Sequence, residues 1–319
     1  MTLSVVVPVL NEERNVPEMA TRVRKVLDAE AIDWELIFID DGSTDATPWQ
    51  LAELNASDAR IKAVHLSRNF GHQAAISLGL RAAAGDAVVV MDGDLQDPPE
   101  MLPEFLARWR EGNDVVYAVR VRRSEGWLKR LSYRVFYRLL TWMSRVDMPL
   151  DSGDFSLMSR RVVDVINAMP ERTRFMRGMR SWTGFRQTGV AQVRGARHAG
   201  DAKYTVRKLI RLALDGFIAS SYRPLQLASL FGVAVSLTAM LLAVGLITLK
   251  LTHGIPLVGW TSLIVAVLFM GGVQLVSLGI LGEYVGRIYE ESRGRPTSVV
   301  ARISGETRLP GPGPQGAAP

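Results

Sequence analysis

Two aspartates separated by one glycine, Asp92-Gly93-Asp94, are the residues of this sequence whose spacing most clearly suggests chemistry. Gln96 adds a neutral side-chain oxygen two residues further on. Hard divalent cations such as Mg²⁺ and Mn²⁺ take oxygen ligands, often one or two carboxylates together with substrate phosphates. A cation held here can stabilise a diphosphate as a leaving group. Because an isolated Asp-x-Asp is also common in solvated turns, its place in the fold decides the interpretation.

A second acidic pair begins the segment Asp40-Asp41-Gly42-Ser43-Thr44-Asp45. Asp, Ser and Thr are typical of helix N-caps, so one or two of these residues can serve there. Two adjacent carboxylates exceed what a cap needs, and they can instead accept hydrogen bonds from a nucleobase N–H and ribose hydroxyls. No Gly-x-Gly-x-x-Gly follows the first predicted strand and no P-loop motif occurs, so neither a dinucleotide-binding fingerprint nor a P-loop is supported.

A third acidic pair, Asp151 and Asp154, flanks Ser152-Gly153. One of these carboxylates can act as a general base towards an attacking hydroxyl. The alternative is that both only orient loops. His72 is equally open, since it can contact a phosphate or have a structural role.

Alternating strands and helices in the first 120 residues would position these acids. Runs of β-branched apolar residues predict strands at 4–9, 35–39, 61–66 and 87–91. Apolar spacing predicts helices at 16–29 and 72–84. This alternation indicates an α/β domain with a largely parallel sheet, in which ligands bind beyond the carboxyl ends of the strands. Two of the predicted strands end directly in acidic pairs, at Asp40/Asp41 and Asp92/Asp94.

The last third of the chain contains two long apolar runs. No charged side chain occurs from Pro224 to Leu249, and none from Leu251 to Gly282 if His253 is neutral. Each run exceeds the roughly 20 residues that cross a bilayer core. The alternative, a pair of buried core helices, is disfavoured because soluble helices of this length normally carry a polar face. The two runs, separated by a short turn, predict a membrane hairpin with Lys and Arg before its first helix and after its second. Because positive residues favour the cytoplasmic side, we expect both chain termini in the cytoplasm.

The predicted organisation follows from these patterns. It comprises an α/β domain at 1–203, a juxtamembrane amphipathic helix at 204–223, transmembrane helices at 224–250 and 257–282, and a cytoplasmic tail at 283–319. The N-terminus lacks the basic region and the long apolar run of a signal peptide. We therefore expect an integral membrane protein.

A basic amphipathic segment lies inside the α/β domain. Between Arg120 and Arg145 the sequence has eight Lys or Arg residues and one acid, interleaved with aromatic and aliphatic residues. This pattern is typical of a helix in a membrane interface, so we predict an interfacial region at 120–146. A nucleic-acid-binding arm is the alternative, which a neighbouring membrane hairpin disfavours.

The composition excludes several other chemistries. The chain has no Cys, which excludes disulfides, thiolate catalysis and Cys-based zinc sites. Its four His residues are scattered, which argues against a histidine zinc cluster. The net charge of +6 favours anionic lipid, phosphorylated substrates or nucleic acid without choosing among them.

Six motifs occur in an order and spacing that can be compared with known families. They are Pro8-Val9-Leu10-Asn11-Glu12-Glu13, 40–45, Ser67-Arg68-Asn69-Phe70-Gly71-His72-Gln73, 92–100, 151–155 and 197–204. Together with the two apolar runs they resemble the family 2 glycosyltransferases, which have a Rossmann-like GT-A fold. More narrowly, they resemble the polyisoprenyl-phosphate glycosyltransferases, the group of dolichol-phosphate mannose synthases and bactoprenol glucosyltransferases. The resemblance covers nearly the whole chain.

The resemblance implies a role for individual positions. The nucleotide sugar would be held by Pro8, Glu12, Asp40, Asp41, Asn69, Gly71, Asp92, Arg197 and Lys203. The metal would be held by Asp92, Asp94 and Gln96, and the acceptor phosphate by Arg120 and Arg134. Asp154 would be the base, with Asp151 beside it. Ala202 stands where related enzymes often carry Ser, which puts a hydroxyl contact there in doubt.

The resemblance implies an inverting transfer of one sugar from a nucleotide sugar to a polyprenyl phosphate, dependent on Mg²⁺ or Mn²⁺, at the bacterial inner membrane. UDP is preferred as the nucleotide, and a GDP-mannose donor is the alternative. A processive polysaccharide synthase is disfavoured because Gln-x-x-Arg-Trp is absent. A catalytically inactive membrane scaffold is the alternative from another class. A homo-oligomer is expected, and no nucleic acid partner.

Overall fold

The computed structural model describes residues 1–120, 152–172, 174–192, 223–253 and 259–309, and divides them into two compact units. The first unit contains the described residues up to Gln192 and those from Arg295 onwards. The second contains two long helices. Nearly all of the predicted interfacial region at 120–146 and of the juxtamembrane helix at 204–223 lies outside the described residues.

The first unit is built on an eight-stranded sheet. Its strands in chain order are β1 (Thr2–Val9), β2 (Asp33–Asp40), β3 (Ile61–Leu66), β4 (Ala87–Val90), β5 (Val115–Arg120), β6 (Ser152–Ser159), β7 (Gln187–Gln192) and β8 (Val300–Ser304). Their order in the sheet is β7-β5-β6-β4-β1-β2-β3-β8. Neighbouring strands are parallel except in the pairs made by β6 and by β8.

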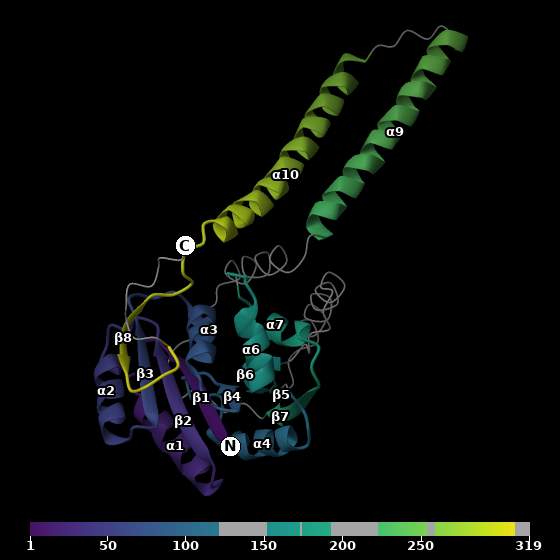
Figure 1. The fold of residues 1–319 in the computed structure, drawn as a ribbon. Helices are drawn as coiled ribbons and strands as arrows, with labels where there is room; N and C mark the ends of the chain where they lie inside the picture. The colour runs from purple at the N-terminus through teal and green to yellow at the C-terminus, as the bar shows by residue number, and fades with distance from the viewer. Residues whose placement is uncertain (121–151, 173, 193–222, 254–258, 310–319) are drawn as a thin grey trace. The chain divides into compact units, whose positions relative to one another are not determined.

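Helices cover both faces of this sheet (Figure 1). One face packs against α1 (Val16–Ala29), α2 (Thr47–Ser57) and α4 (Leu102–Arg110), which η1 (Pro99–Met101) precedes. The other face packs against α3 (His72–Ala82), α6 (Arg160–Ala168) and α7 (Met176–Trp182). Successive strand side chains point to opposite faces, so Val5 and Val7 join the first core and Val6 the second. Burial on both faces explains why β1 is a continuous apolar run.

The predicted α/β fold class is confirmed. The four predicted strands correspond to β1 to β4, and the helix predicted at 16–29 is α1. The helix predicted at 72–84 ends two residues earlier, at Ala82. The sequence analysis did not predict β8, which lies in the expected tail and pairs antiparallel with β3.

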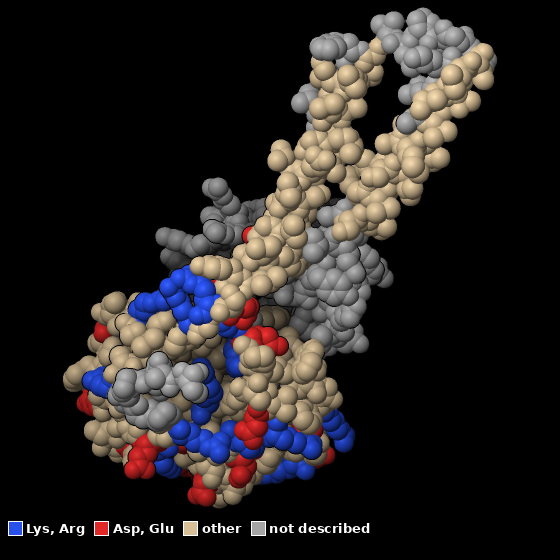
Figure 2. Space-filling view, turned by 45° about the horizontal axis from the view of Figure 1, so that its top comes forward, with Lys and Arg blue, Asp and Glu red and all other residues tan. Residues whose placement is uncertain are grey.

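The second unit consists of α9 (Arg223–His253) and α10 (Trp260–Ser292). Among the described residues, one helical segment, Ser262–Ser292, is long and apolar enough to cross a membrane. Its most apolar stretch of 18 residues has a mean hydropathy of 2.3, and no part of that stretch is buried. In α9 the described apolar stretch, Ser229–Leu242, is shorter. Figure 2 shows both helices almost free of charged side chains, whereas Lys, Arg, Asp and Glu are mixed over the surface of the first unit. A two-span hairpin stays a prediction.

Helix α10 extends about ten residues beyond the predicted span, which ended at 282. The predicted end was the end of the apolar run. The helix continues past it because the charged and polar residues that follow are compatible with a helix. The helix ends where Gly294 adopts a positive φ of 62°, the left-handed conformation that commonly terminates helices.

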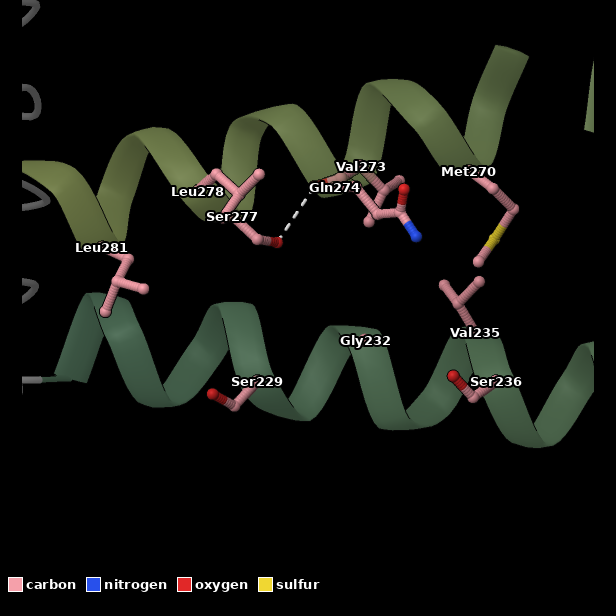
Figure 3. Close-up of a pocket in the computed structure, with 10 residues that line it drawn as sticks. All are labelled: Ser229, Gly232, Val235, Ser236, Met270, Val273, Gln274, Ser277, Leu278 and Leu281. Carbon is pink, nitrogen blue, oxygen red and sulfur yellow. Dashed lines mark hydrogen bonds between the residues drawn. The ribbon is translucent and has the colours of Figure 1, made fainter. Parts of the chain in front are cut away.

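A cavity of about 780 Å³ lies between α9 and α10 (Figure 3). Its lining is mainly apolar but includes Ser229, Ser236, Gln274 and Ser277. The Ser277 hydroxyl donates to the carbonyl of Val273 in its own helix at 2.9 Å. Such back-bonding satisfies a hydroxyl within one apolar helix, so Ser277 does not tie the two helices together.

Candidate active site

The paired strands β1 and β4 mark the place in the sheet where the direction in which successive strands are added reverses. The chain runs from β1 outwards to β2 and β3, and then returns to β4 on the other side of β1. Pairing of β1 with β4 covers Leu3 to Val6, and Pro8 beyond it is paired only with β2. The loops after β1 and β4 therefore diverge at Pro8. In open α/β sheets, ligands bind in the crevice at such a switch point.

A glycine lets the two loops meet closely at the base of this crevice. A Cβ built on Gly93 would lie 2.9 Å from Cγ1 of Val9 and 3.0 Å from the carbonyl oxygen of Pro8. No side chain fits there without movement of β1. The glycine between Asp92 and Asp94 is thus required by the approach of the β4 loop to the end of β1.

Asp40, at the end of β2, is only 2% exposed and has a partner for each carboxylate oxygen. The Ser43 amide donates to Oδ1 at 2.9 Å, and Nδ1 of His65 lies 2.8 Å from Oδ2. Burial raises the pKa of Asp40, but the hydrogen bonds from His65 and Ser43 outweigh it, so the pKa is lowered overall. Asp40 is therefore a buried, ionised carboxylate.

Asp41 holds the loop that follows β3. Its Oδ1 accepts the amide of Phe70 at 2.7 Å and its Oδ2 the amide of Gly71 at 2.9 Å. Asn69 lies in this same loop, and Gly71 takes a φ of 100° before α3 begins. The structure thus brings the predicted positions Asp41, Asn69 and Gly71 together, with Asp41 as the brace of the loop.

The loop after β1 is attached to the loop after β2. The Asn11 amide donates to Ser43 Oγ at 2.9 Å, and Thr44 returns a bond from its amide to Asn11 Oδ1 at 2.8 Å. The Glu12 amide donates to Thr47 Oγ1 at 3.0 Å, and its carboxylate accepts the side-chain amide of Asn15. Glu12 is therefore fixed at the rim of the crevice.

The acidic loop after β4 is electrostatically different. Asp92 Oδ1 is buried and accepts no hydrogen bond from the described residues. Its nearest cationic neighbour is His72 Nε2, at 3.4 Å. Burial, followed by repulsion from Asp97, raises the pKa of Asp92 to about 6. Where the resemblance places a cation, the protein thus carries a buried carboxylate oxygen that accepts no hydrogen bond from the described residues and whose charge His72 offsets only in part.

The other residues of this loop hold it in shape. Asp94 Oδ1 accepts the amide of Gln96 at 3.1 Å. Gln192, at the end of β7, donates to the Gln96 carbonyl at 3.2 Å and to Asp97 Oδ1 at 3.0 Å. Gln192 and Asp97 were not predicted as site residues; Gln192, on β7, orders the loop by binding Gln96 and Asp97 within it.

These residues fit a hard divalent cation. Asp92 offers an orphaned buried oxygen, Asp94 a second carboxylate and Gln96 an amide oxygen. Within the described parts of the chain, no group of three or more His, Asp or Glu residues is arranged to hold a metal by itself. A site with two carboxylates matches Mg²⁺ or Mn²⁺ completed by phosphate oxygens and water.

Asp154, on β6, is the centre of a charged cluster facing Asp92. Arg177 Nε donates to its Oδ1 at 3.0 Å, and Gln73 Nε2 to its Oδ2 at 3.3 Å. His72 Nε2 lies 3.5 Å from Oδ2, so this ring stands between Asp154 and Asp92. Burial raises the pKa of Asp154, but His72 and Arg177 lower it to about 2. Asp154 is therefore ionised and weakly basic.

Sequence reasoning missed Arg177 and Gln73, and left His72 undecided. Arg177 and Asp154 come from α7 and β6, and no local motif links them. Arg180, one turn further along α7, is 2% exposed and lies with its guanidinium 5.1 Å from the Tyr117 ring centroid. A buried arginine beside an acidic cluster is a signal that appears only in three dimensions.

Four predicted site residues cannot be placed in the crevice. Asp151, Arg134, Arg197 and Lys203 lie outside the described residues. Arg120 is the last residue of β5, whose carboxyl end lies at the same sheet edge as that of β4, since both strands run antiparallel to β6. The backbone thus places Arg120 at the edge that holds the other site residues.

Comparison with known proteins gives consistent matches. Residues 4–166 match the model of Glycosyl transferase family 2. The uncharacterized glycosyltransferase YkcC of Bacillus subtilis is 45% identical, over 95% of this chain and 94% of that protein. The bactoprenol glucosyl transferase of Shigella phage SfV is 42% identical, over 94% of this chain and 98% of that protein. Among solved structures, S. aureus TarS 1–349 in complex with UDP-GlcNAc has a TM-score of 0.46 and 18% identity, over 69% of this chain and 66% of that chain.

Proposed function

The chain belongs to glycosyl transferase family 2 and is a glycosyltransferase, and we propose that it transfers one sugar from a nucleotide sugar to a polyprenyl phosphate with inversion. The observation that carries the proposal is Asp92 at the β1/β4 switch point, where a buried Oδ1 accepts no hydrogen bond from the described residues and a cation bound to a diphosphate would offset its charge. The acceptor class is inferred from the phage bactoprenol glucosyl transferase, which this chain resembles over nearly the full length of both.

The donor nucleotide would lie against the loops after β1, β2 and β3. Pro8 and Glu12 would line the crevice, while Asp40 and Asp41 would shape it and present their remaining lone pairs to base and ribose. Asn69 and Gly71 would complete this side. Arg197 and Lys203 would cover the diphosphate. UDP is the proposed nucleotide, and a GDP-mannose donor is the alternative.

Mg²⁺ or Mn²⁺ would be held by Asp92, Asp94 and Gln96. When bound, the cation neutralises charge on the departing diphosphate. Asp92 is prepared for this role, because burial and Asp97 make its isolated charge unfavourable.

On the acceptor side, Arg120 and Arg134 would grip the polyprenyl phosphate, since the planar guanidinium matches phosphate geometry. The phosphate oxygen would attack the anomeric carbon as the bond from that carbon to the diphosphate oxygen breaks. A phosphate monoester is largely ionised at neutral pH, so a strong base is unnecessary. Asp154 is the predicted base, but its pKa near 2 makes it a poor proton acceptor, so it would instead fix His72 and Arg177 beside the reacting groups. Asp151 is proposed to belong to the same site.

We further propose that α9 and α10 form a membrane hairpin in the bacterial inner membrane. Regions 120–146 and 204–223 would lie in the interface, and both termini in the cytoplasm. Homo-oligomers would form through the hairpin. An inactive scaffold is the alternative, which the retained carboxylates Asp92 and Asp94 disfavour.

The test is direct. Purified full-length protein in detergent is given undecaprenyl phosphate, MnCl₂ or MgCl₂, and a panel of radiolabelled UDP- and GDP-sugars. Metal-dependent transfer of label from one donor into the organic phase is expected. Asp92→Asn should abolish it, while Glu100→Gln, a carboxylate change on the surface of the same loop region, should not. No transfer from any donor by folded protein would favour the scaffold.

A further inference from the structure

Three side chains form a row across the edge of the sheet that carries the donor loops. In the register of β2 and β3, Asp40 stands opposite His65. In the register of β3 and β8, His65 stands opposite Arg302. Directly opposite residues on neighbouring strands project from the same face and can interact. The row therefore leads from the C-terminal strand to the carboxylate at the end of β2.

Hydrogen-bond distances connect all three residues. Arg302 Nη2 lies 3.2 Å from His65 Nε2, and His65 Nδ1 lies 2.8 Å from Asp40 Oδ2. A guanidinium can only donate, so Nε2 must be the acceptor. The remaining ring proton then sits on Nδ1 and is donated to Asp40. Asp40 and Arg302 thus favour the same tautomer of His65, and together they fix the orientation of its ring.

Strand β8 also supports the loop that Asp41 braces. The Ser67 amide, at the start of that loop, donates to the Val299 carbonyl at 2.9 Å, just before β8. The β3/β8 register shifts between His65 and Leu66, so the ladder is irregular where the two contacts occur. The C-terminal segment therefore contacts both carboxylate-containing parts of the predicted donor pocket.

We propose that His65 and Arg302 are positioning residues for Asp40, and that strand β8 thereby forms part of the donor-nucleotide pocket. The inference rests on the proposed function, because it assumes that Asp40 faces a nucleotide. Without Arg302, the His65 ring loses the hydrogen bond at Nε2 and is held only by its N–H to Asp40. Asp40 keeps its hydrogen bonds, but the orientation of the His65 ring, and with it that of the carboxylate, is less firmly fixed. Binding of the nucleoside part weakens, while the reacting groups after β4 are untouched.

Arg302 is well suited to testing this inference. Arg302 is exposed, so replacing its side chain leaves no cavity in the core. Replacing Arg308, which is also exposed and lies in the same C-terminal segment, is the matched control, because it removes the same charge away from His65. The full-length protein in detergent is titrated with UDP, and in parallel with GDP, by calorimetry in MnCl₂. Steady-state transfer kinetics and melting temperatures are measured on the same samples.

Arg302→Ala should raise the Kd for the nucleoside diphosphate and the donor KM about fivefold, the factor of one ordinary hydrogen bond. The kcat at saturating donor and the melting temperature should stay at wild-type values. Arg302→Lys retains a donor and should recover most of the affinity, and Arg308→Ala should bind like wild type. His65→Asn keeps an N–H for Asp40 but has no acceptor at the position of Nε2, where Arg302 donates, so adding Arg302→Ala to it should change nothing further.

Arg302→Ala with wild-type Kd and KM would overturn the inference and leave the proposed function intact. A parallel fall in kcat or in melting temperature, or an equal effect of Arg308→Ala, would also overturn it, because the strand would then act on stability or overall charge. A wild-type protein that binds neither UDP nor GDP and transfers no sugar would refute the proposed function itself, and this inference with it.

Discussion

Replacing Asp41 with Asn tests whether this carboxylate braces the pocket or contacts the ligand directly. In the structure, Oδ1 and Oδ2 each accept one backbone amide, from Phe70 and from Gly71. Asn keeps one acceptor oxygen and turns an NH₂ group towards the other amide. Two donors then face each other, and one buried amide loses its partner.

The size of the effect follows from these contacts. A hydrogen bond to a charged group contributes about 1.5–3 kcal/mol, and the second bond is weakened because the oxygen no longer carries a charge. We expect Asp41→Asn to destabilise the catalytic unit by about 2–3 kcal/mol. For a unit of this size, that corresponds to a fall in melting temperature of roughly 4–12 °C. The amides of Phe70 and Gly71 should also exchange hydrogen faster, which mass spectrometry of the 67–73 peptide can detect.

The control is Glu53→Gln, the same chemical change on the exposed side of α2. It should leave the melting temperature and the exchange of the 67–73 peptide unchanged. UDP affinity of Asp41→Asn should fall only moderately, since high ligand concentration can reorder the loop. The bracing role is refuted by an Asp41→Asn protein that melts and exchanges like wild type yet no longer binds UDP.

Three further predictions concern the same crevice. Asp92→Asn should abolish transfer yet stabilise the apo-protein by about 1–3 kcal/mol in EDTA at pH 7.5; because the pKa of Asp92 is raised to about 6, this gain should shrink as the pH falls and vanish near pH 4, which thermal melts across pH will show. Arg177→Ala should raise the pKa of Asp154 and lower kcat about tenfold, with Arg177→Lys intermediate; an unchanged kcat contradicts a role for this pair at the reacting groups. Gly42→Ala places a Cβ 2.5 Å from the Arg68 carbonyl carbon on a residue with a φ of 78°. The free energy of unfolding, measured by denaturant unfolding, should therefore fall by at least about 2 kcal/mol, and an unchanged value contradicts the geometry.

The central strands could be predicted because their signal is local. A run such as Val5–Val7 is apolar and β-branched on both faces, which only a buried parallel strand explains well. The same logic failed for β8, which has five residues, two of them exposed, and no alternation strong enough to recognise. Its partner β3 lies more than 230 residues earlier, and no local pattern records that pairing.

The acidic pairs show a similar limit. Their position at strand ends was predictable, since strand ends and turn residues are visible in the sequence. Their partners were not predictable, because His65, Phe70 and Arg177 reach Asp40, Asp41 and Asp154 from other elements. The suggestion that part of the Asp40–Asp45 segment serves as a turn agrees with Asp45, whose carboxylate accepts the Thr47 amide at 3.0 Å, whereas the N-cap of α2 is Ala46, which makes no side-chain cap bond.

The two halves of the crevice differ in a way that suggests how a ligand would be bound. On the side of β1, β2 and β3, the carboxylates of Asp40 and Asp41 are already satisfied by the protein, so this half is rigid before any ligand arrives. On the side of β4, Asp92 has a buried oxygen that accepts no hydrogen bond from the part of the chain that the structure describes, and its charge is unfavourable although His72 lies 3.4 Å away. Preorganisation lowers the entropy cost of binding, whereas relief of an uncompensated charge adds a favourable contribution when a cation enters. The nucleoside half should therefore set which donor fits, and the β4 half should make tight binding depend on the cation that accompanies the diphosphate.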